Sequence, residues 1–146
     1  MDKRTLWAAA LFLFIVGDGV ATQVRGALLP NIKGSFAVSD SLLGLVAPAG
    51  TVGYLVAAVA VGFAADRIDT RRFLLLGAGG TAVCLLLLSQ VPTYALFLVL
   101  LCGQGMAIGV FRGLDRPLLG TLYPDQRGRL FNLYGLTWAV GAVAGP

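Results

Sequence analysis

The chain has 146 residues, of which 58% are apolar and only 12% are charged, and it carries a formal net charge of +4. This composition, with a mean hydropathy of +0.85, excludes an ordinary soluble domain and is typical of a membrane protein. Aromatic and basic residues are not interleaved on any soluble surface, so we expect no nucleic-acid partner and attribute the basic excess to membrane topology.

The first apolar segment covers residues 6–29 and can cross a bilayer, whose hydrocarbon core needs about 20 apolar residues of helix. Asp18 lies near its centre, where an ionisable side chain is costly and indicates a functional site. We predict that Asp18 carries protons or binds a cationic substrate; an aspartate that only holds helices together is the alternative. Thr22 and Arg25 share its helical face and are further candidates, although Arg25 near the outer boundary also fits snorkelling to headgroups.

The same segment also fits a cleaved signal peptide, because Lys3 and Arg4 precede an apolar centre and the small residues 19–21. Asp18 argues against this alternative, since a charged residue is poorly suited to a cleavage site. We therefore expect the segment to be the first of several membrane spans.

Two further apolar segments, residues 41–65 and 73–91, are separated by a short charged stretch. Each segment is long enough to span the membrane, so we expect the stretch between them to be a tight hairpin. Its distinguishing residues are Gly62, Asp66, Arg67, Arg71 and Arg72.

This charged stretch resembles the cytoplasmic loop between the second and third helices of major facilitator superfamily transporters. The family pattern is a glycine, three intervening residues, an aspartate, a basic residue, one spacer, a glycine and two basic residues. Gly62, Asp66 and Arg67 match it in order and spacing, whereas Asp69 stands where the later glycine is expected. The resemblance implies that Asp66, Arg67 and Arg71 form a cytoplasmic charge cluster that stabilises one conformation.

The fourth apolar segment covers residues 93–114, with an apolar extension toward Leu122. Gln104 lies at nearly the depth of Asp18, and its amide offers donors and acceptors that either orient a substrate or form an interhelical hydrogen bond. A ridge of glycines at every fourth position follows it and predicts the close approach of another helix. These glycines are Gly105, Gly109 and Gly113.

Arg112 and Arg116 continue the same stripe toward the cytoplasmic end, with Asp115 beside them. We consider Arg112 a candidate for substrate contact, with snorkelling or a topological role as the alternative. Many proton antiporters of the superfamily carry an arginine a few residues before a Gln-Gly pair in this helix. Here Leu101 occupies that position, which argues against an antiporter mechanism.

A fifth apolar segment, residues 130–146, is still apolar where the sequence stops. Its last residues resemble the end of the glycine-proline signature of drug/proton antiporters, although Asn132 replaces an earlier glycine. Gly141 and Gly145 predict close helix contact, and Pro146 predicts a bend. Family members have twelve helices in two similar halves, so we expect an all-α, polytopic bundle of which this chain supplies the first four helices and part of the fifth.

Orientation follows from the basic residues of the connections. Most of them fall before the first segment, after the second and after the fourth, whereas the opposite connections offer only Lys33. The basic residues of the first group are Lys3, Arg4, Arg67, Arg71, Arg72, Arg127 and Arg129. We therefore expect the N-terminus in the cytoplasm, with the protein in the cell membrane.

The sequence has no phosphate-binding loop, nucleophile elbow or metal-ligand spacing, so we expect no cofactor, no metal and no enzymatic activity. Cys84 and Cys102 are expected to be packing residues. The resemblance implies a secondary transporter that moves small molecules by alternating access, with proton-coupled efflux as one form of it. Two alternatives stay open: a helical membrane protein that does not transport, such as an assembly partner or enzyme subunit, and an inactive truncated transporter.

Overall fold

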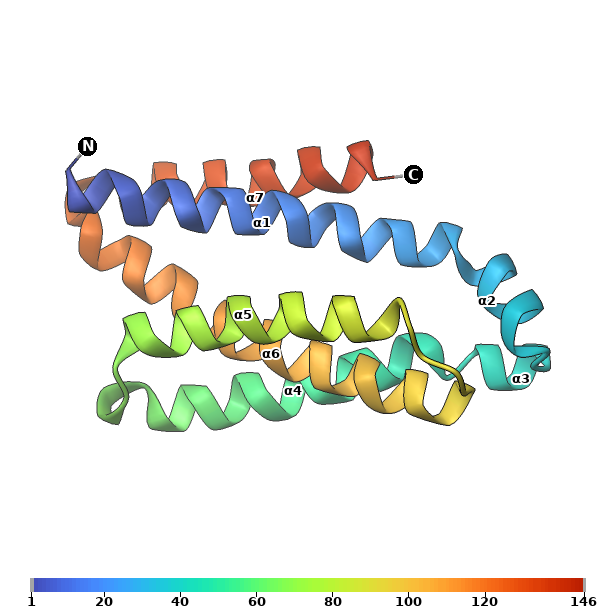
Figure 1. Ribbon diagram of the computed structural model, residues 1–146. Coiled ribbons are helices and arrows are strands. Elements are labelled where there is room, and N and C mark those ends of the chain that lie inside the picture. The colour runs from blue at the N-terminus through green and yellow to red at the C-terminus, as the bar shows by residue number, and fades with distance from the viewer. Residues whose placement is uncertain (1, 146) are drawn as a thin grey trace. The chain divides into compact units, whose positions relative to one another are not determined.

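The computed structural model describes residues 2–145, and of Asp66 only the backbone. The described residues form helices joined by turns, without a β-strand (Figure 1). The helices are α1 Lys3–Ala27, α2 Leu29–Phe36, α3 Asp40–Leu43, α4 Val46–Ala64, η1 Ala65–Arg67, α5 Thr70–Leu88, α6 Tyr94–Leu122, η2 Pro124–Gln126 and α7 Arg127–Ala144.

Four of the described helical stretches are long and apolar enough to cross a membrane. They are Lys3–Ala27, Asp40–Ala64, Thr70–Leu88 and Tyr94–Leu122. Because a run of this length satisfies its own backbone hydrogen bonds, a helix is the form in which such sequences enter lipid. The protein is therefore an integral membrane protein of the all-α class.

The described chain falls into two compact units. The first, which we call the α1–α7 unit, contains residues 2–31 and 116–145, and in it α1 and α7 lie side by side (Figure 1). The second, the α4–α6 unit, contains residues 32–115 with α4, α5 and most of α6. Candidate site residues occur in both units.

The connection expected at residues 30–40 differs from a simple loop because it contains α2. Pro30 is its second residue, where a missing backbone N–H removes no helical hydrogen bond. Ala37 has a positive φ of 50° and follows the last residue of α2. Such a left-handed residue is a common way to end a helix, although glycine takes this conformation at lower cost.

The fourth apolar segment forms one helix that continues beyond residue 114 through Pro117 to Leu122. Proline inside a helix removes one backbone hydrogen bond and favours a bend. The apolar residues after it, Leu118, Leu119 and Leu122, are buried. Their burial explains why the helix persists past the proline.

Candidate functional site

Small residues bring α1 and α7 into close contact within the α1–α7 unit. A Cβ atom on Gly19 would overlap the backbone oxygen of Trp138, and one on Gly141 would overlap the backbone oxygen of Val16. A Cβ on Gly145 would come 2.9 Å from the oxygen of Val20. This glycine seam lets the two backbones approach as closely as small residues allow in membrane helix pairs. Pro146, for which a bend is predicted, lies outside the described residues.

Asp18 lies on this seam, next to Gly19, and is only 8% exposed. Its Oδ2 accepts a hydrogen bond of 3.1 Å from the indole Nε1–H of Trp138 on α7. A buried carboxylate needs such donors because it has lost its hydration. The site therefore joins an ionisable group of α1 to a fixed donor on α7.

Trp138 is a site residue that the sequence analysis missed. It shares a helical face with Tyr134, Gly141 and Gly145, which lie at the spacings expected for one side of a helix. Tyr134 is 1% exposed and packs edge-on against Phe12, with 5.4 Å between ring centroids. This stripe of glycines and aromatics was the signal that could have placed Trp138 against the first helix.

The other two candidates on α1 differ from Asp18 in their surroundings. Thr22 is exposed and Arg25 is partly buried in the described structure. The sequence places all three on one face, but only Asp18 lies at the closest approach of α1 and α7. The roles of Thr22 and Arg25 stay predictions.

A second glycine seam joins α4 and α6 in the α4–α6 unit. A Cβ on Gly105 would overlap the backbone oxygen of Gly50, and one on Gly109 would overlap that of Tyr54. A Cβ on Gly113 would come 3.0 Å from Cγ1 of Val61. The predicted packing role of the glycine ridge is thus confirmed, and its partner is α4.

Gln104 precedes this ridge and is 1% exposed. A buried amide can donate and accept, so it fits both a helix-to-helix bond and a substrate contact. Leu101, which stands where antiporters of the family carry an arginine, is buried at 2% exposure. That position is therefore part of the apolar core.

Asp115 is more buried than its place near the end of α6 suggested, with 1% exposure. It follows Arg112 by three residues, so the two lie on neighbouring positions of the same helix face. Arg112 itself is half-buried. In the sequence, Asp115 directly follows the predicted span 93–114, a position at which a charged side chain usually reaches water.

The charged loop shows how Asp69 acts in place of the family glycine. Asp69 is the N-cap of α5: its Oδ1 accepts from the backbone N–H of Arg71 at 3.1 Å and of Arg72 at 3.3 Å. The Arg72 Nε–H also reaches Oδ2 at 3.1 Å. Aspartate and glycine both rank among acceptable N-cap residues, so the departure from the pattern preserves the start of the helix.

The remaining loop residues are placed only in part. Gly62 lies in the last turn of α4, where a Cβ atom would meet no other atom within 4 Å, and Arg67 and Arg71 are exposed. The side chain of Asp66 lies outside the part that the structure describes. The charge cluster of Asp66, Arg67 and Arg71 therefore stays a prediction.

Comparison with known proteins shows which protein family the chain belongs to. The family model of the Major Facilitator Superfamily matches residues 6–146, and the chain belongs to this superfamily of transporters. No solved structure matches the chain.

Individual relatives cover almost the whole chain at low identity. Synaptic vesicle glycoprotein 2A of Rattus norvegicus is 29% identical over 138 residues, 91% of this chain and 18% of the relative. Puromycin resistance protein pur8 of Streptomyces alboniger is 25% identical over 150 residues, 99% of this chain and 29% of the relative. The gallate transporter of Pseudomonas putida is 29% identical over 119 residues, 82% of this chain and 26% of the relative. The chain thus spans less than a third of each relative's length.

Proposed function

We propose that the chain supplies the first helices of a secondary active transporter that moves a small organic molecule by alternating access. Membership of the superfamily supports the transport class, and in such proteins two helical bundles rock around a site near the midplane. Two relatives, named as a puromycin resistance protein and a gallate transporter, support small organic molecules as the substrate class.

The observation that carries the proposal is the buried Asp18 in the middle of α1. An ionisable residue at this depth is costly to insert, by about 2.5–3.5 kcal/mol, and is retained where it serves a function. Its bond to Trp138 holds the carboxyl group at the α1–α7 seam. In this proposal Asp18 carries a coupling proton or binds a cationic substrate, and proton-coupled efflux is one form that such transport takes.

The charged loop supports an orientation with the N-terminus in the cytoplasm. Its basic residues lie between two spans of the α4–α6 unit, and basic residues concentrate on the cytoplasmic side. In this proposal Asp66, Arg67 and Arg71 stabilise one conformation of the carrier. Asp66→Ala is expected to reduce transport several-fold while the protein still inserts, measured as flux per inserted molecule. Unchanged flux would remove the loop from the mechanism.

Flux across vesicles tests the function itself. The protein made from its complete reading frame is reconstituted with a pH gradient, and a panel including puromycin and gallate is offered. We expect one class of compound to move with the gradient, and Asp18→Asn to lower that flux at least about tenfold, because the amide keeps an acceptor for Trp138 but cannot carry a proton.

Asp125→Asn is the matched control, since the same chemical change falls on an exposed residue of η2. It is expected to leave flux within about twofold. If no compound moves, or if Asp18→Asn transports like the unaltered protein, the transport role of Asp18 is wrong. The first result would favour a membrane protein with a role other than transport.

A further inference from the structure

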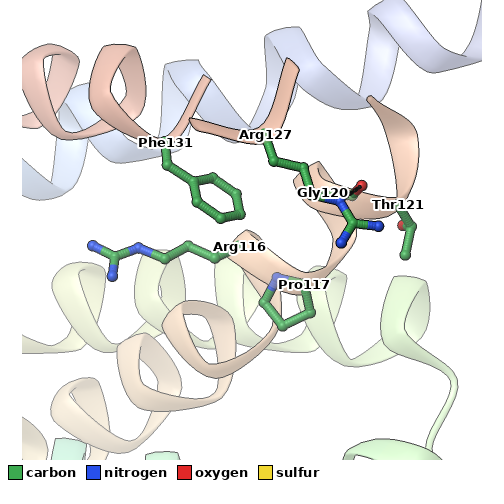
Figure 2. A pocket seen from close by; sticks show the side chains of 6 residues that line it. All are labelled: Arg116, Pro117, Gly120, Thr121, Arg127 and Phe131. Carbon is green, nitrogen blue, oxygen red and sulfur yellow. Dashed lines mark hydrogen bonds between the residues drawn. The ribbon is translucent and has the colours of Figure 1, made fainter. Parts of the chain in front are cut away.

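An open groove lies where α6 ends and α7 begins, entirely within the α1–α7 unit. Its volume is about 370 Å³ (Figure 2). It is lined by Arg116, Pro117, Gly120, Thr121, Arg127 and Phe131. We propose that this groove, the Arg116–Arg127 groove, binds the phosphate headgroup of an anionic phospholipid.

Arg127 is held in a fixed position at one side of the groove. Its Nε–H donates to the backbone oxygen of Gly120 at 3.0 Å, and Figure 2 shows the guanidinium beside Gly120 and Thr121. This hydrogen bond uses only Nε, so the two terminal nitrogens of the guanidinium take no part in it. A guanidinium whose orientation is already fixed loses less side-chain entropy when it binds, and its planar fork matches phosphate oxygens.

The other walls favour a lipid over a free anion. Phe131 and Pro117 add apolar surface to the lining of the groove, one on each side of the Arg116 side chain (Figure 2). A phospholipid brings a phosphate together with a glycerol and acyl chains, so it can fill the charged and the apolar parts at once. A free phosphate ion would leave this apolar surface in contact with water, so its binding would include no favourable free energy from apolar burial.

The position along the chain places the groove at headgroup level. The candidate span of α6 ends at Leu122, and α7 starts with Arg127. From residue 116 to residue 131 the chain has three arginines and one aspartate, a net charge of +2. Basic pockets at the ends of membrane helices attract anionic headgroups, which are concentrated in the cytoplasmic leaflet. In the orientation proposed above, this end of α6 faces that leaflet.

Binding of short-chain phosphatidylglycerol to the full-length protein in neutral detergent tests the proposal. Arg127→Gln is expected to weaken binding about tenfold, which corresponds to one charge-assisted hydrogen bond of modest strength. Arg129→Gln is the matched control, because this arginine is exposed on the same turn but does not line the groove. We expect it to weaken binding less than about twofold.

Two further variants keep the test decisive if Arg127→Gln does not fold. Arg116→Gln removes the second charge without touching the bond to Gly120, and it is expected to weaken binding several-fold. Phe131→Ala removes apolar wall and keeps both charges, so it is expected to weaken phosphatidylglycerol but not inorganic phosphate.

Three outcomes would overturn the lipid site. Equal losses for Arg127→Gln and Arg129→Gln would mean a diffuse surface charge. Phosphatidylcholine binding as tightly as phosphatidylglycerol would mean that the arginines do not select the headgroup. Inorganic phosphate or glycerol phosphate binding as tightly as the lipid would identify a site for free anions. The assay measures binding without flux, so its failure leaves the transport proposal untouched.

Discussion

The two units use the same packing device around different polar groups. In both, glycines let two helices meet at backbone distance: Gly19 and Gly141 between α1 and α7, Gly50 and Gly105 between α4 and α6. The first seam encloses a carboxylate, Asp18, whereas the second has a neutral buried amide, Gln104, beside it. Close backbone packing is therefore common to the fold. A carboxylate lies beside the closest contact of the α1–α7 seam, whereas the buried carboxylate of the other unit, Asp115, follows the last glycine of its ridge.

This difference separates stability from function. Glycine seams stabilise helix pairs in lipid through van der Waals contact, because the hydrophobic effect does not drive helices together in an apolar solvent. A carboxylate on such a seam adds a desolvation cost that packing alone does not need. Changes at the α4–α6 seam should hence act on folding, and changes around Asp18 should act on transport beyond their effect on folding.

The largest expected effect on stability is that of Gly105→Ala. Its Cβ would overlap the backbone oxygen of Gly50 and come 2.9 Å from the carbonyl carbon. Backbone atoms cannot rotate away, so α4 and α6 must separate, at a cost of about 2–3 kcal/mol. Denaturant unfolding in detergent micelles measures the loss of free energy.

Gly79→Ala is the control for this substitution, because a Cβ on Gly79 of α5 meets no atom within 4 Å. Alanine there should be neutral or stabilise the helix by up to about 1 kcal/mol. If Gly105→Ala has the same free energy of unfolding as the unaltered protein, the α4–α6 seam is looser than its glycines indicate. The two seams would then not share the same close backbone packing.

Trp138→Phe tests the polar group at the α1–α7 seam. The change keeps an aromatic ring but removes the Nε1–H that donates to Asp18. Losing a hydrogen bond to a buried acidic group is expected to cost about 1.5 kcal/mol of unfolding free energy. If Asp18 couples transport, flux per folded molecule should also fall and its dependence on external pH should shift.

Trp7→Phe is the matched control, since it makes the same change elsewhere on α1, away from the Asp18–Trp138 bond. It should leave the pH dependence of flux unaltered. A Trp138→Phe protein with lower stability but an unchanged pH profile would give the bond a purely structural role.

The sequence predicts the larger features of this fold because they depend on local composition. Long apolar runs indicate helices wherever they occur, and Asp18 is conspicuous because it interrupts one. The partner of Asp18 is a different matter. Trp138 lies 120 residues away along the chain, and finding it requires the register between α1 and α7, which no local pattern contains.

The helix-start preferences of individual residues predict two features that the hydropathy pattern does not show. Pro30 fits the first turn of a helix, which is how α2 forms within an expected loop. Asp69, which precedes Arg71 and Arg72, is a residue type that favours an N-cap. In the family pattern this position is a glycine, so Asp69 was counted only as a departure from that pattern. The burial of Asp115 is different again, because it depends on tertiary packing around the end of α6.

Asp69→Ala is expected to have the smallest effect, about 1 kcal/mol, because it removes the cap of α5 and leaves both seams unchanged. Asp69→Asn keeps the capping oxygen and removes the charge, so it loses the exposed pair with Arg72 and the attraction of the carboxylate to the start of α5, together about 0.5 kcal/mol. Asp69→Gly restores the family residue and should cost a few tenths of a kcal/mol. Unfolding measured at low and high salt separates the contributions, since salt screens the interactions of the charge and has little effect on the geometry of the capping hydrogen bonds. If Asp69→Asn loses as much as Asp69→Ala, the charge rather than the cap fixes the start of α5, and the tolerance for glycine at this position needs another explanation.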